Sequence, residues 1–295
     1  MILLQKLRRY NVNKKILSIL LVLLLGAVFL VGCEPQSEEE EINLGYVNWA
    51  EGIAMTFLAE AIIEDELGYA VNNTMADVGP TFQGMASGDL DAFMDVWLPV
   101  THQSYVEQME GEIVEIGVNY RGARIGLVVP EYVEIDSILE INDYVDDFEG
   151  EIIGIDAGAG LMQATAQAID EYELDYQLLE GSGAAMTASL QTAIRNNEPI
   201  IVTGWSPHWK FARWDLKYLE DPENVFGELE TIYTYSRAGF ADDFPEVADF
   251  LTNFELDDDQ LGDLMGAIAD SDEEAIVVAR EWKEENAELV NTWLN

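Results

Sequence analysis

The chain has 295 residues, of which 57 are acidic and 14 basic, and its formal net charge at pH 7 is −43. So acidic a protein excludes nucleic acid as a partner, because binding to a phosphate backbone needs lysine and arginine to replace counterions. The single cysteine, Cys33, excludes an internal disulfide.

The first 33 residues have the pattern of an export signal. Five basic residues precede an apolar stretch over 16–31, which is shorter than the roughly 20 residues of a membrane span. Gly32 and Cys33 follow directly, which is similar to a lipoprotein processing site. We therefore expect a lipoprotein signal over 1–33 with an acylated Cys33, so that the protein is extracytoplasmic and lipid-anchored to the cell membrane. The alternative is an uncleaved N-terminal anchor helix.

Residues 34–41 are predicted to be an acidic tether, because they end in four glutamates and contain nothing that could pack in a core. The remainder, 42–295, is long enough for two lobes of about 125 residues each. Removing the signal leaves nine basic against 57 acidic residues, a net charge of −48. The acids are spread along the chain, which indicates a hydrated surface.

Short apolar strands alternate with helical stretches along the rest of the chain, and this alternation predicts an α/β fold. We expect strands over 42–47, 92–96, 125–129, 152–155 and 200–203, and helices over 54–66, 81–87, 162–172, 184–196 and 245–253.

One spacing occurs twice in this alternation. Trp97 follows Gly45 by 52 residues, Trp205 follows Gly154 by 51 residues, and each tryptophan begins a Trp-x-Pro sequence. The repeat predicts two similar lobes, with the chain crossing between them near 121–124 and 233–237. Lobe I would then be 42–123 plus 234–295, and lobe II would be 124–233, with a ligand cleft between them.

Three tryptophans are expected at that cleft. Trp97 and Trp205 end predicted strands and Trp49 follows another, and α/β folds bind ligands beyond the carboxyl ends of their strands. An indole face attracts cations, and a quaternary ammonium group, which has no N–H donor, can be recognised by such faces. The ordinary alternative is that each tryptophan is a core residue. The other four lie on predicted helices and are assigned to the core: Trp209, Trp214, Trp282 and Trp293.

An anion site is predicted beside the tryptophans. Residues 156–162 form a glycine-containing turn before a helix, where free amides such as those of Gly160 and Leu161 favour a carboxylate. His102 follows Trp97 by five residues and can donate a hydrogen bond to the same group. The alternative for this turn is a plain helix start, since it lacks the spacing of a phosphate or dinucleotide motif.

The segments 45–51, 88–102, 154–160 and 203–209 together resemble the glycine betaine-binding proteins of the OpuA/ProX type, and the resemblance covers nearly all of the chain after the tether. It implies a type II periplasmic-binding-protein fold that closes around a small zwitterionic quaternary ammonium ligand. It also implies a cage of Trp49, Trp97 and Trp205, and a carboxylate held by Gly160, Leu161 and His102. The partner would be the permease of an ABC transporter, and no cofactor, metal or catalytic residue is expected.

Several alternatives remain open from the sequence. A proline betaine, carnitine or choline receptor would share the fold, although choline has no carboxylate to bind at Gly160. An enzyme would need His102 or His208 paired with Asp95 or Asp156. The sequence contains no Gly-x-Ser-x-Gly elbow, no HExxH motif and no paired-ligand metal spacing. A surface lipoprotein that binds a protein partner is the third alternative and predicts a large exposed apolar patch.

Overall fold

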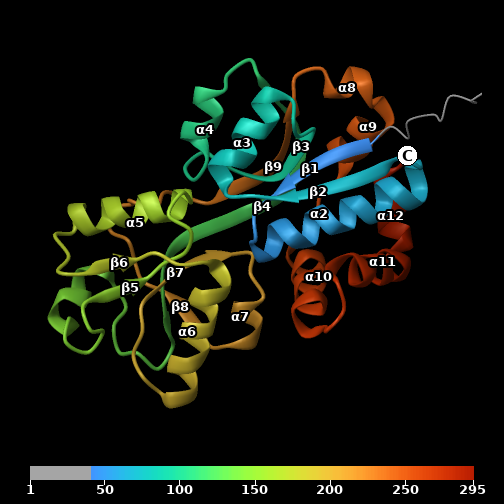
Figure 1. Ribbon diagram of the computed structural model, residues 1–295. Coiled ribbons are helices and arrows are strands. Elements are labelled where there is room, and N and C mark those ends of the chain that lie inside the picture. Colours follow the sequence, from blue (N-terminus) through green and yellow to red (C-terminus); the bar gives the residue numbers. More distant parts are fainter. Residues whose placement is uncertain (1–40) are drawn as a thin grey trace, which may run out of the picture. The chain divides into compact units, whose positions relative to one another are not determined.

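The computed structural model describes residues 41–295, which form one unit (Figure 1). The predicted signal over 1–33 and all but the last residue of the predicted tether over 34–41 lie outside the described residues. Among the helices of residues 41–295, none combines the length and apolar character needed to cross a bilayer. Each of the ten predicted strands and helices is present, and Pro245–Asn253 has the predicted bounds.

The N-terminal part is a β-α-β-α-β unit with three parallel strands in the order β2-β1-β3. Glycines at φ +78° (Gly68) and +82° (Gly88) end its two helical segments, since only glycine adopts this conformation without strain. The elements are β1 (Glu41–Tyr46), α2 (Ala50–Ile62), the π-helical turn η1 (Ile63–Leu67), β2 (Ala70–Met75), α3 (Val78–Ser87) and β3 (Ala92–Leu98).

A second β-α-β-α-β unit repeats this arrangement, with its parallel strands in the equivalent order β6-β5-β7. The repeated spacing in the sequence therefore corresponds to a repeated structural unit. Its elements are β5 (Glu151–Ile153), α5 (Gly160–Glu171), β6 (Gln177–Leu179), α6 (Gly183–Asn196) and β7 (Val202–Ser206), followed by α7 (Lys210–Arg213) and β8 (Leu216–Tyr218).

Two antiparallel strands connect the units. The long strand β4 (Ile113–Pro130) pairs with β9 (Glu230–Arg237) up to Ala123 and with β7 from Arg124 onward. The strand order is β2-β1-β3-β9-β4-β7-β5-β6, and β8 pairs with β4. The fold is the two-lobed α/β type with a curled sheet (Figure 1). The lobe bounds 42–123 with 234–295, and 124–233, remain a prediction.

The C-terminal helices pack on the first unit and on the long strand β4. α10 and α11 pack against α2, and α9 packs against β4. α10 begins with a reciprocal capping box between Asp257 and Gln260, which satisfies two free amides at its start. The bounds are α4 (Gln103–Gln108), the 3₁₀ turn η2 (Ile138–Tyr144), α8 (Phe240–Asp243), α9 (Pro245–Asn253), α10 (Asp258–Asp270), α11 (Ala275–Glu285) and α12 (Ala287–Trp293).

Candidate functional site

Trp49, Trp97 and Trp205 line one small cavity. All three are buried, and no more than 6 % of any of them is exposed. The same cavity is lined by six further residues: Glu51, Thr101, Ile125, Ile155, Ala159 and Leu161. The structure thus brings three of the seven tryptophans together, although they are spread over 157 positions of the sequence.

Strand pairing fixes the positions of two of these tryptophans. Trp97 lies on β3 opposite Ile232 of β9, and Trp205 lies on β7 opposite Ile125 of β4. Trp49 occupies the residue before α2, directly beyond the end of β1. The cavity is therefore at the carboxyl ends of the parallel strands of both units, where α/β folds bind ligands.

Two of the three indole rings are held by buried carboxylates. The indole N–H of Trp97 donates to Asp95 Oδ1 at 2.7 Å, and that of Trp205 donates to Glu51 Oε2 at 2.8 Å. The indole N–H of Trp49 is buried and has no hydrogen-bond partner among the described residues. A ring fixed by its N–H keeps its face at a constant angle to the cavity, which an aromatic cage requires.

The two carboxyl groups that accept these indole N–H groups are buried, which is unfavourable for a negative charge. Burial, with repulsion from Asp95, raises the pKa of Glu51 well above its usual value, although the hydrogen bond from Trp205 acts in the opposite direction. Burial also raises the pKa of Asp95. Lys210 is fully buried nearby, with its Nζ 4.0 Å from the centre of the Trp205 ring and donating to the Trp205 carbonyl. Burial lowers the pKa of Lys210.

His102 is fully buried beside the cage and does not line the cavity. Its ring stacks on Trp49, with the ring centres 5.9 Å apart, and its Nδ1 accepts from the backbone N–H of Trp97 at 3.0 Å. Burial lowers its pKa to about 3, so the ring is neutral and carries its proton on Nε2. That Nε2 is buried and has no partner among residues 41–295. His102 therefore offers an unused hydrogen-bond donor.

The predicted anion-binding turn begins α5. Gly160 and Leu161 are its first two residues, so their amides have no carbonyl one turn earlier in the helix to bind. Leu161 and the preceding Ala159 line the cavity, whereas Gly160 packs against the loop after β3. A Cβ at Gly160 would overlap the carbonyl of Thr101, so this close approach requires glycine.

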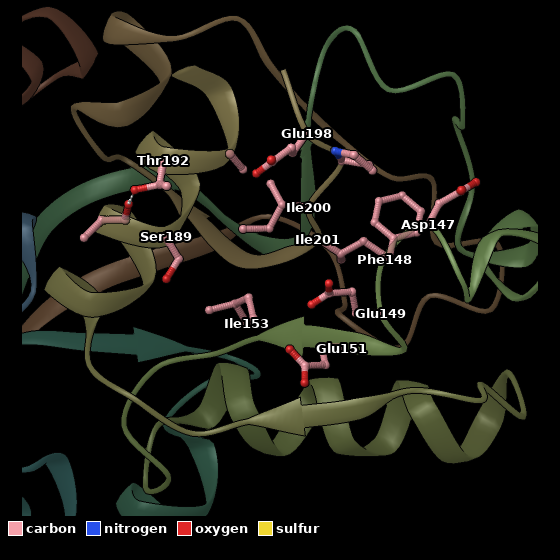
Figure 2. A pocket seen from close by; sticks show the side chains of 13 residues that line it. Asp147, Phe148, Glu149, Glu151, Ile153, Ser189, Thr192, Glu198, Ile200 and Ile201 are labelled. Carbon is pink, nitrogen blue, oxygen red and sulfur yellow. Dashed lines mark hydrogen bonds between the residues drawn. The ribbon is translucent and has the colours of Figure 1, made fainter. Parts of the chain in front are cut away.

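A larger cavity lies at the opposite ends of the second unit's strands (Figure 2). Figure 2 shows acidic side chains around an apolar floor that includes Phe148, Ile153 and Ile200. It is formed by α6, by β5 with the segment before it and by the segment before β7, so it lies at the amino ends of these two strands. Its acidic residues are Asp147, Glu149, Glu151 and Glu198. The tryptophan cavity, at the carboxyl ends, is the stronger candidate.

The pairs that an enzyme would need are not formed in the described part of the chain. Nδ1 of His102 and Nδ1 of His208 each accept a backbone N–H, and neither ring bonds a carboxylate among residues 41–295. Within the same residues, no group of three or more histidine, cysteine or acidic side chains could hold a metal ion.

Four of the six predicted ligand residues therefore line one cavity, and His102 and Gly160 lie beside it. Sequence reasoning missed Glu51 and Thr101. An acid two residues after Trp49, in the first turn of a helix, was the available signal for Glu51. Trp209 and Trp214 flank the four-residue α7 rather than lying within a helix, whereas Trp282 and Trp293 are buried helical core residues, as predicted.

The chain matches the family OpuAC, described as the substrate-binding domain of ABC-type glycine betaine transport systems, over residues 40–285. It is 44 % identical over 147 residues to the glycine betaine/carnitine transport binding protein GbuC of Listeria monocytogenes. This alignment covers 48 % of each protein, so it spans about half the length of that curated relative.

Solved structures of related proteins cover more of the chain. A glycine betaine/L-proline-binding protein (ProX) from Borrelia burgdorferi is 35 % identical with a TM-score of 0.83, over 87 % of this chain and 97 % of that one. Lactococcal OpuAC, in a closed conformation with glycine betaine, is 31 % identical with a TM-score of 0.81, and the match covers 87 % of this chain and 100 % of that one. An ABC-transporter choline-binding protein in complex with choline is 25 % identical with a TM-score of 0.80, and the match covers 88 % of this chain and 93 % of that one.

Proposed function

Because the chain belongs to the OpuAC family of substrate-binding domains of ABC-type glycine betaine transport systems, we propose that it is a receptor for glycine betaine or proline betaine. The single observation that carries this proposal is that Trp49, Trp97 and Trp205 line one cavity. The ligand would be delivered unchanged to a permease, and its uptake would serve osmoprotection.

The cage accounts for recognition of the methylated nitrogen. A desolvated contact between a cation and an indole face contributes about 2 kcal/mol, so three such contacts contribute on the order of 6 kcal/mol. Micromolar affinity corresponds to about 8 kcal/mol. The aromatic contacts would therefore supply most of the binding free energy, and the other end of the ligand would supply the rest.

We infer that the ligand carboxylate binds between α5 and His102. The amides of Gly160 and Leu161 open the helix, and the positive end of a helix favours an anion. His102 would add its Nε2–H, which has no partner among the described residues. Trp49, Trp97 and His102 belong to predicted lobe I, whereas Trp205, Gly160 and Leu161 belong to predicted lobe II. One ligand would therefore contact both lobes and stabilise their closed arrangement.

A calorimetric panel of glycine betaine, proline betaine, carnitine and choline tests this function. We expect saturation at one equivalent, and tighter binding of glycine betaine than of choline, because only the betaine has a carboxylate. Saturable binding of choline alone would instead favour the choline receptor that one structural relative represents. Absence of binding to all four compounds would contradict the proposal, and turnover of choline or betaine esters would favour the enzyme alternative.

We also propose that Cys33 carries a lipid that anchors the protein outside the cytoplasm. The proposal rests on the apolar stretch over 16–31 followed by Gly32 and Cys33, all outside the described residues. Labelling of expressing cells with a radioactive fatty acid is expected to mark the wild-type protein and not the Cys33→Ala variant. Equal labelling of both proteins, or of neither, would contradict the lipid assignment and leave the ligand proposal unaffected.

A further inference from the structure

Glu230 holds the loop that leads from Trp97 to His102. It is the first residue of β9 and is only 1 % exposed. One carboxylate oxygen, Oε2, accepts the backbone N–H groups of Val100 and Thr101 at 2.8 and 2.9 Å. The other oxygen, Oε1, accepts the hydroxyl of Thr101. One side chain therefore engages three donors of a loop that is 129 positions away in the sequence.

This arrangement determines the loop's orientation. A buried carboxylate is costly unless donors satisfy it, and hydrogen bonds to a charged acceptor are stronger than those between neutral groups. Two successive amides that point at one oxygen restrict the backbone between them to a narrow range of conformations. Gly227, at φ +74°, allows the segment before β9 to approach Val100, since a Cβ at Gly227 would lie 2.6 Å from a methyl carbon of Val100.

The same loop touches both structural units at the cavity. Thr101 lines the cavity with the three tryptophans, and its carbonyl packs against Gly160 at the start of α5. Glu230 itself pairs with Ala123 of β4, and the next residue, Arg124, pairs with β7. Glu230 is therefore located where the sheet passes from one unit to the other.

From this placement we propose that Glu230 is a positioning residue for the ligand site. It sets the loop 99–102 so that Thr101 meets Gly160 and so that His102 stands at the carboxylate end of the ligand. It also links the strands that cross between the units to the loop that contacts the ligand. The role of His102 in this inference rests on the proposed function, whereas the loop geometry does not.

The experiment compares Glu230→Gln with Asp91→Asn. Asp91 is a suitable control because it is also a buried carboxylate, and it accepts the backbone N–H of Asn43 at 2.7 Å. It lies just before β3, at the other end of that strand from Trp97 and the loop that Glu230 holds. A glutamine at 230 offers one acceptor oxygen and an amide that repels the N–H donors. We expect Glu230→Gln to weaken glycine betaine binding at least tenfold and choline binding less, with Asp91→Asn within about threefold of the wild type.

Amide hydrogen exchange gives a second measurement that needs no ligand. The Val100 and Thr101 amides are expected to exchange at least tenfold faster in Glu230→Gln than in the wild type, and to be unchanged in Asp91→Asn. Glu230→Asp, which keeps the charge but is one methylene shorter, should act in the same direction if the glutamine variant does not fold. Wild-type exchange at both amides, or equal losses of affinity in the two variants, would overturn the proposal. Failure of the wild type to bind betaine would contradict the proposed function and not the exchange result.

Discussion

Glu51 and Trp205 are 154 positions apart in the sequence, and the buried carboxylate of Glu51 accepts the indole N–H of Trp205 at 2.8 Å. Glu51 is in the first turn of α2, whereas Trp205 is on β7 of the second unit. A residue of the first unit therefore holds the indole ring of a tryptophan of the second unit. Because Glu51 also lines the cavity, this hydrogen bond joins the two units at the cavity itself.

Replacing Glu51 tests this relationship. Glu51→Ala leaves the indole N–H of Trp205 buried without its acceptor, and we expect betaine binding to weaken about tenfold, which equals about 1.4 kcal/mol. Glu51→Gln keeps an acceptor oxygen and should bind more tightly than the alanine variant. Calorimetric titration measures both, with Glu255→Ala as the control because Glu255 forms an exposed ion pair with Arg121. Equal affinity of Glu51→Ala and wild type would show that Trp205 does not need this acceptor.

Removing one of the cavity tryptophans is expected to lower ligand affinity more than replacing a core tryptophan. Trp97→Ala and Trp205→Ala should each weaken glycine betaine binding at least tenfold, because each loses one contact with the cation. Trp282→Phe is the control, since Trp282 is buried in α11 and its indole binds Asp263. It should lower the melting temperature and leave affinity unchanged. Wild-type affinity in both cage variants would refute the cage.

Gly160→Ala tests the contact between α5 and the loop after β3. The added methyl would overlap the carbonyl of Thr101, so the two segments would have to move apart and the site would not close. We expect betaine affinity to fall at least tenfold. Gly262→Ala is the matched control, because Gly262 lies in α10 and a Cβ there meets nothing within 4 Å. The control should retain affinity and gain up to about 1 kcal/mol of stability from the better helix former.

The buried neutral His102 makes stability depend on pH. Burial lowers its pKa from the usual 6.5 to about 3, so the unfolded chain binds a proton that the folded chain does not. The contribution of the neutral His102 to the free energy of unfolding is fully present above pH 6.5 and is lost as the pH falls from 6.5 towards 3. Between pH 6.5 and 5 the wild type should lose about 2 kcal/mol relative to His102→Gln.

Urea denaturation of both proteins at several pH values measures that difference. The comparison is needed because burial also raises the pKa of Glu51 and of Asp95, so these two acids make the fold more stable as the pH falls, which is opposite to the effect of His102. The wild type and His102→Gln both keep these acids, so the difference in their stability isolates the effect of the histidine. Parallel stability curves would indicate that His102 is not buried as a neutral group.

The sequence was sufficient to predict the repeated unit and to predict that Trp49, Trp97 and Trp205 lie together. Trp97 and Trp205 could be placed because each ends a strand in a repeated spacing, and parallel strands with equivalent surroundings carry their ligand residues at equivalent ends. Leu161 could be placed because a glycine-containing turn before a helix leaves free amides at a known location. These signals are local, so a single sequence contains them.

The contacts of Glu51 and Glu230 were not predictable in the same way. Each depends on how distant segments approach one another, and neither residue type nor spacing specifies a partner 154 or 129 positions away. The strands β6 and β8 have three residues each, too few to show an alternating pattern. The sequence predicts a strand only over 125–129, whereas β4 begins at Ile113. The first half of β4 has mixed exposure and includes glycines at 117 and 122, so it lacks a clear strand pattern.

The position of β9 affects the order in which the sheet can form as the chain emerges with its N-terminus first. β9 lies between β3 and β4, so the strands of the first unit cannot join β4 in the sheet until residues 230–237 have emerged. β5, β6 and β7 pair with one another and with β4, and all of them have been made by residue 206. The part of the sheet that is encoded later is therefore the first that a growing chain can complete, and the nascent N-terminal strands must wait for it with one edge unpaired.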